Sequence, residues 1–215
     1  MTTKEFVALE KDLLRELPGL AIKGSLMFIP PVGSLLRGIS FKRSSDKDRF
    51  YVSAFVIPLC VPTNHLYFNF GHRMRHGGAD GWNRGMPDLL WELSAALKSQ
   101  AMPPLSPVNS LLEFAEFAGQ FNPKSLPTLR AIAYSLARAG EKRRAIDVLD
   151  RLAALCDPAV EWQRTLAQEG QGLKEKLLGD PEEARRQLEA WESETVHNLG
   201  LADVWESGER GSRSR

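Results

Sequence analysis

The sequence has few cysteines and no long apolar segment. Only Cys60 and Cys156 occur among its 215 residues, and two widely separated thiols predict a reduced protein rather than a disulfide scaffold. No apolar run approaches the roughly 20 residues that span a bilayer. The charged N-terminal residues also lack the layout of a secretory signal. We therefore expect a cytoplasmic protein without a membrane segment.

An excess of charge and a catalytic motif are missing as well. The 28 basic and 27 acidic residues leave a net charge of +1, which disfavours a nucleic acid or an acidic membrane as partner. No Gly-x-Ser-x-Gly elbow occurs, and the glycine-rich segment 77–81 lacks the lysine and hydroxyl of a phosphate-binding loop. We therefore predict no catalytic residue and no cofactor.

The chain does contain a region of alternating apolar and polar residues. Three strands are predicted there, the first beginning at Leu36, the second at Arg49 and the third covering 65–72. The second strand is apolar on both faces, so it belongs inside a sheet that is covered on both sides. Residues 26–29 precede two prolines and are expected to form a short edge strand.

Helical periodicity surrounds these strands. Thr2 and Glu5 have the spacing of a capping box, which predicts a helix over 3–17. A glycine-rich polar loop over 72–86 precedes another predicted helix, and the segment 102–107 is interpreted as a break. The predicted fold class is therefore α+β, an antiparallel β-meander of three to four strands with packed helices, followed by α-helical hairpins.

Strand patterns end near residue 123. Apolar and small residues then recur at the spacing of a helical hairpin that turns at Gly140, and a weaker copy turns at Gly179, 39 residues later. This pattern resembles the tetratricopeptide repeat, whose period is close to 34 residues. We predict a sheet domain over 1–122, a repeat-like helical region over 123–206 and a disordered tail over 207–215.

A metal site was considered at His72 and His76. Their spacing would place two imidazoles on one helical face. However, Arg73 and Arg75 repel a cation, and the glycines that follow argue against a helix. We therefore predict no metal site.

A basic cluster interleaved with aromatic residues is the better candidate surface. Acidic residues interrupt it, which favours a protein partner over a single-stranded nucleic acid. An aromatic anchor with arginines at its rim is typical of protein interfaces. The predicted partner-binding residues are Trp82, Arg73, Arg75, Arg84, Tyr67 and Arg43.

Three sequence segments carry a resemblance to a known family. Residues 39–45, 49–56 and 65–71, together with the order of helix and meander, resemble a bacterial family of uncharacterised function that is grouped with the immunity proteins of polymorphic toxin systems. The resemblance covers roughly residues 1–120. It implies a protein-binding module, and it supplies no catalytic residues.

The leading hypothesis is therefore a non-catalytic interaction module, an immunity protein that binds and occludes a toxin. One alternative is an enzyme that acts on a phosphorylated or nucleic-acid substrate through the loop over 72–84. Another is an adaptor that uses only the helical repeats. The sequence leaves the partner and the oligomeric state open.

Overall fold

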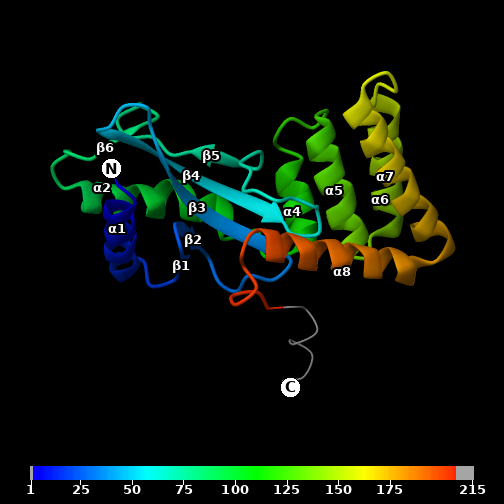
Figure 1. The fold of residues 1–215 in the computed structure, drawn as a ribbon, viewed down its shortest axis with the longest axis horizontal. Coiled ribbons are helices and arrows are strands. Elements are labelled where there is room, and N and C mark those ends of the chain that lie inside the picture. Colours follow the sequence, from blue (N-terminus) through cyan, green and yellow to red (C-terminus); the bar gives the residue numbers. More distant parts are fainter. Residues whose placement is uncertain (1, 207–215) are drawn as a thin grey trace. The chain divides into compact units, whose positions relative to one another are not determined.

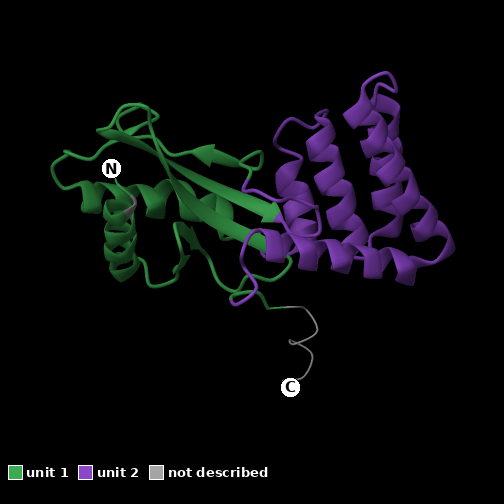
Figure 2. Cartoon of the chain, viewed as in Figure 1, with its two compact units in different colours: residues 1–57, 67–108, 204–215 green, residues 58–66, 109–203 purple. Residues whose placement is uncertain are grey.

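A computed structural model describes residues 2–206, and it confirms the predicted α+β class (Figure 1). The chain divides into two compact units (Figure 2). Unit 1 comprises residues 1–57, 67–108 and 204–215, and unit 2 comprises residues 58–66 and 109–203. The tail predicted over 207–215 lies outside the described residues. Among the residues that are described, no helix is both long and apolar enough to cross a bilayer.

The sheet of unit 1 has six strands within the described residues. Five follow one another as neighbours, and β6 pairs with β4 beside β5. The long strands β3 and β4 form the central hairpin (Figure 1). The strands are β1 (Ala21–Lys23), β2 (Leu26–Phe28), β3 (Leu35–Arg43), β4 (Arg49–Pro58), β5 (Gly71–Arg73) and β6 (Trp82–Asn83).

The second half of β4 is buried on both faces, as its sequence predicts. Phe55, Val56 and Ile57 have no exposed surface, whereas Tyr51 and Ser53 nearer the hairpin turn are half-buried. The sheet is therefore covered on both faces only along the part of β4 that follows residue 54.

The segment over 26–29 was predicted as an edge strand, and that prediction is wrong. Its strand, β2, pairs with β1 on one side and with β3 on the other, with Met27 opposite both Ile22 and Ile39. The two prolines lie beyond the end of β2 at Phe28, so they remove no donor from its ladder.

The predicted strand over 65–72 is also wrong for most of its length, because β5 begins only at Gly71. Side chains before it bond to nearby backbone: the Thr63 hydroxyl donates to the His65 carbonyl at 2.9 Å. Such local bonds compete with a sheet ladder. One of the alternating aromatic residues packs against the sheet instead: Phe68 lies edge-on to Phe55 of β4 with ring centroids 4.9 Å apart.

Residues 72–86 form more regular structure than the predicted loop. They include the end of β5, all of β6 and a tight turn in which His76 and Ala79 exchange backbone hydrogen bonds of 3.0 and 2.9 Å. Gly77 and Gly78 occupy the turn with φ of 55° and 82°, a conformation that side chains rarely adopt. The Gln100 side-chain amide accepts a hydrogen bond from the N–H of Arg75 and donates one to its carbonyl, both at 2.9 Å. These bonds hold the backbone between β5 and the turn.

Helices complete unit 1. The predicted capping box of α1 is present, since the Thr2 hydroxyl accepts from the Glu5 N–H and the Glu5 carboxylate accepts from the Thr2 N–H. The segment predicted as a break at 102–107 instead contains a helical turn that continues directly from the preceding π-helix. The helical elements are α1 (Thr3–Glu16), α2 (Leu89–Ala96), the π-helix η1 (Leu97–Ala101) and α3 (Met102–Leu105).

Unit 2 contains the two predicted helical hairpins. Gly140, with φ of 85°, ends the first helix of one hairpin, and the Asp180 side chain caps the second helix of the other at 3.1 Å. The second copy is more complete than its sequence suggests, because a full helix precedes its turn. The helices are α4 (Leu111–Ala118), α5 (Leu126–Arg138), α6 (Lys142–Leu155), α7 (Glu161–Gly179) and α8 (Pro181–Asn198).

The interior of unit 2 holds an ion pair beside a buried thiol. Glu192 on α8 has a side chain that is 2% exposed, and one of its carboxylate oxygens lies 3.1 Å from Nε of Arg138 on α5. Cys60 is fully buried, and its burial raises its pKa to about 12, with the Glu192 carboxylate as a further cause. The thiol therefore serves as a buried packing group.

Candidate functional site

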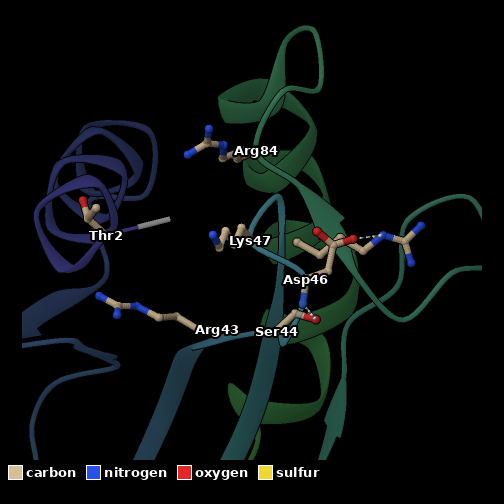
Figure 3. Close-up of a pocket in the computed structure, with 7 residues that line it drawn as sticks. Thr2, Arg43, Ser44, Asp46, Lys47 and Arg84 are labelled. Atoms are coloured by element: carbon tan, nitrogen blue, oxygen red, sulfur yellow. Dashed lines mark hydrogen bonds and ion pairs between the residues drawn. The ribbon is translucent and has the colours of Figure 1, made fainter.

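A cationic pocket in unit 1 lies at the turn between β3 and β4 (Figure 3). Its volume is about 290 Å³. The hairpin turn, the N-terminal end of α1 and the residue that follows β6 all contribute to it. The residues that line it are Thr2, Arg43, Ser44, Asp46, Lys47, Arg49 and Arg84.

The hairpin turn positions the basic side chains through its own hydrogen bonds. The Ser44 hydroxyl accepts from the Asp46 N–H at 3.2 Å, and the Asp46 carboxylate accepts from the Asp48 N–H at 2.9 Å. The backbone N–H of Arg49 closes the turn on the Asp46 carbonyl at 3.1 Å. Short polar side chains favour such turns because they bond the backbone locally. Lys47 is consequently held at the tip.

Arg84 joins the turn to α1. Its backbone N–H donates to the Asp48 carbonyl at 2.8 Å, and its Nε lies 2.8 Å from the Asp48 carboxylate. Its guanidinium also lies 3.8 Å from the Glu5 carboxylate. The hydrogen bonds from Thr2 are the main cause that lowers the pKa of Glu5, and the charge of Arg84 contributes. The pocket is thereby assembled from three separate parts of the sequence.

The basic side chains share a direction. Figure 3 shows Arg43, Lys47 and Arg84 extending toward the space in front of Thr2, whereas Asp46 points away from them. The Asp46 carboxylate pairs instead with Arg49, at 3.8 Å from its Nε. Three cations therefore face one cavity of an almost neutral protein. Such a concentration of like charge attracts anions locally and over short range.

The structure brings only two of the predicted partner-binding residues together. Arg43 and Arg84 line the pocket. Arg73 instead lies over the ring of Tyr51, 4.1 Å from its centroid, and Arg75 pairs with Asp80 at 2.8 Å.

The two predicted aromatic residues have different surroundings. Tyr67 packs edge-on against Phe70 with ring centroids 6.1 Å apart. Trp82 lies opposite Phe50 in the ladder of β4 and β6 and has no exposed surface. The proposed role of Trp82 as an anchor is therefore corrected: its ring belongs to the core of unit 1, where a partner cannot reach it.

Part of the pocket is absent from the predicted binding residues. Lys47 and Arg49 line the pocket but were not among the predicted partner-binding residues, and Thr2 was predicted only as part of a helix cap. The available signal is the placement of Arg43, Lys47 and Arg49 around a polar hairpin turn. No sequence signal places Thr2 or Arg84 beside that turn.

No group of three or more His, Cys, Asp or Glu side chains in residues 2–206 is arranged to hold a metal ion. His76 faces Glu92 at 3.6 Å and packs against Trp82, whereas His72 is exposed on β5.

Comparison with known proteins adds no assignment. No family model matches the chain, and neither a curated protein nor a solved structure is significantly similar to it.

Proposed function

We propose that this chain is a non-catalytic protein-binding module and that its cationic pocket receives an anionic group of the partner. The observation that carries the proposal is the shared direction of Arg43, Lys47 and Arg84 toward one cavity. Complementary charge orients a partner and accelerates encounter even where the net charge of the protein is close to zero. An exposed hairpin turn also reaches a partner surface without rearrangement of the sheet.

The family resemblance of residues 39–71 extends the proposal to one class of partner. A polymorphic toxin would be neutralised by occlusion, with the hairpin turn of this chain placed against an acidic region of the toxin. We also propose that the binding takes place in the cytoplasm, where an immunity protein of that class would meet the toxin.

The test is co-purification with the product of the adjacent gene, combined with charge reversal. The variant Arg43→Glu/Lys47→Glu should weaken binding at least about tenfold, equivalent to about 1.4 kcal/mol, because it replaces two attractive charges by two repulsive ones. Isothermal titration calorimetry on the purified pair measures this change.

The matched control is Lys42→Glu/Lys98→Glu, which alters net charge equally at two exposed residues outside the pocket. Lys42 neighbours Arg43 on β3 but points to the opposite face of the sheet. Equal loss of affinity in the two double variants would refute the pocket as the binding site.

A second candidate function, the repeat adaptor, rests on a groove between α6 and α7 in unit 2. Its volume is about 540 Å³, and Ala153 and Ala167 are among its lining residues. Trp162 and Leu155 near the intervening turn are 55% and 50% exposed. Retention of the partner by the pocket variant and its loss on Trp162→Ala would favour this adaptor function.

A further inference from the structure

We propose that the cationic pocket is selective for a phosphoryl dianion over a carboxylate, and that the partner presents this group on a phosphorylated side chain. This inference rests on the proposed function, because it assigns the chemistry of the group that enters the same pocket.

The pocket is larger than one carboxylate requires. A volume of about 290 Å³ is many times the roughly 10–15 Å³ that a cavity needs in order to hold one water molecule. A tetrahedral phosphate and the methylene that carries it therefore have room to enter. The hairpin turn and the N-terminal end of α1 lie on different sides of the pocket, and the side chains of Arg43 and Lys47 on its wall are exposed to solvent (Figure 3).

The cations around the cavity suit a tetrahedral anion. Arg43 ends β3 and Arg84 follows β6, so their guanidinium groups approach the cavity from separate elements. Each guanidinium offers a planar fork of donors that matches two oxygens of a phosphate, and Lys47 adds a compact charge between them. A carboxylate has only two oxygens, and a single fork that binds in the bidentate manner occupies both of them.

An incoming anion must compete with the carboxylates that already pair with Arg84. Arg84 already has Asp48 at 2.8 Å and Glu5 at 3.8 Å. A carboxylate from a partner would exchange one monoanion for another, with little net gain at such solvent-exposed pairs. A phosphomonoester carries close to two negative charges at neutral pH, so it gains attraction that the resident groups do not supply.

The aromatic residues near the basic cluster favour a phosphorylated protein over a nucleic acid. Single-stranded nucleic acids bind through bases that stack on exposed rings. The ring of Tyr51 is covered by the guanidinium of Arg73 at 4.1 Å, and Trp82 is fully buried. These two rings therefore offer no exposed platform on which a base could stack beside the pocket.

The test titrates the full-length protein with three short peptides of glycine and alanine that differ only at a central phosphoserine, glutamate or serine. Amide resonances of residues 43–49 and Arg84 are followed by NMR. We expect the phosphoserine peptide to shift these resonances and to bind at least tenfold more tightly than the glutamate peptide. Its affinity should fall severalfold from pH 7.5 to pH 5, because its second pKa is close to 6. The glutamate peptide should show no such fall.

Two further probes identify the source of the phosphate. Weaker binding of inorganic phosphate than of the phosphoserine peptide supports a phosphorylated side chain, whereas equal binding overturns that part of the proposal in favour of a free phosphate compound. A single-stranded oligonucleotide that binds more tightly than the phosphoserine peptide also overturns it. Lys47→Gln should reduce the selectivity severalfold, and Lys42→Gln should retain it. Both variants replace exposed side chains, and their folding is checked by thermal unfolding.

The outcomes separate the two proposals. Equal binding of the glutamate and phosphoserine peptides at residues 43–49 would overturn phosphate selectivity and leave the pocket as the partner site. Absence of any shift, together with full partner binding by the Arg43→Glu/Lys47→Glu variant, would overturn both.

Discussion

Replacement of Arg138 by methionine should destabilise the protein by about 3 kcal/mol. The substitution removes the guanidinium that lies 3.1 Å from Glu192 and 3.5 Å from Glu189. The Glu192 side chain is 2% exposed, so the substitution would leave a carboxyl group without its partner in a site that solvent hardly reaches. Loss of one partner from a buried pair typically costs about 3–5 kcal/mol. Urea unfolding at pH 7 measures the change.

Arg185→Met on α8 provides the matched control. Arg185 also pairs with two glutamates, at 2.8 and 2.9 Å, but its side chain is 51% exposed. Solvent screens such pairs, so the loss of stability should be much smaller than that caused by Arg138→Met. In the double variant Arg138→Met/Glu192→Leu, part of the lost stability should return, because no buried charge remains. A similar small loss for Arg138→Met and Arg185→Met would contradict this description of the interior of unit 2.

The second large effect is a dependence of stability on pH that originates at Glu10. This residue of α1 has no exposed surface, and neither carboxylate oxygen has a hydrogen-bond partner. Burial raises its pKa from 4.5 to about 7. Four residues earlier on the same helical face, Phe6 packs against Phe50 of the sheet with ring centroids 5.6 Å apart. The acid therefore points into an apolar interior and prefers to be neutral.

The sign of this dependence follows from proton linkage. A raised folded-state pKa means that the folded protein holds the proton more tightly than the unfolded chain. The resulting stability is present below about pH 4.5 and is lost as the pH rises through about 7. Glu10→Gln should therefore raise the free energy of unfolding at pH 8 by about 2–3 kcal/mol and change it little at pH 4.5. Urea unfolding across this range gives both values.

Glu16→Gln controls for the change in net charge, because Glu16 lies on the same helix and is exposed. It should leave the pH profile of the unmodified protein intact. A Glu10→Gln variant that retains the same decline between pH 5 and pH 8 would show that other groups cause it.

Local sequence patterns predicted the elements that depend on neighbouring residues. The capping box of Thr2 and Glu5 located the start of α1, and the glycine at 140 located the turn between α5 and α6. These signals were sufficient because each contact joins residues a few positions apart.

Contacts between residues that are distant in the sequence explain why the predictions for 65–72 and for Trp82 were wrong. Alternation over 65–72 resembled a strand. However, pairing of this segment with β4 begins only near residue 70, where the Phe70 carbonyl accepts a hydrogen bond from the backbone N–H of Val56. At Gly71 a side chain would collide with the Ala54 carbonyl, so glycine permits the close approach at which β5 begins. Trp82 was predicted to lie in a loop because no pattern in the neighbouring sequence indicates that β6 pairs with β4.

The candidate site could be predicted only in part for the same reason. Arg43, Lys47 and Arg49 surround one hairpin turn, so their proximity follows from the strand pattern. Arg84 joins them through Asp48, and Thr2 joins them through the contact between Glu5 and Arg84. These contacts depend on the tertiary arrangement of α1, β4 and β6.

The most direct test of the proposal that the pocket is the partner site is the acetylation rate of Lys47 in the presence of the product of the adjacent gene. Mass spectrometry compares this rate with that of the free protein, and exposed Lys42 and Lys98 serve as internal references. We predict that the partner slows acetylation of Lys47 severalfold and leaves the two reference lysines unchanged. Equal acetylation of Lys47 in the complex and in the free protein would contradict the account.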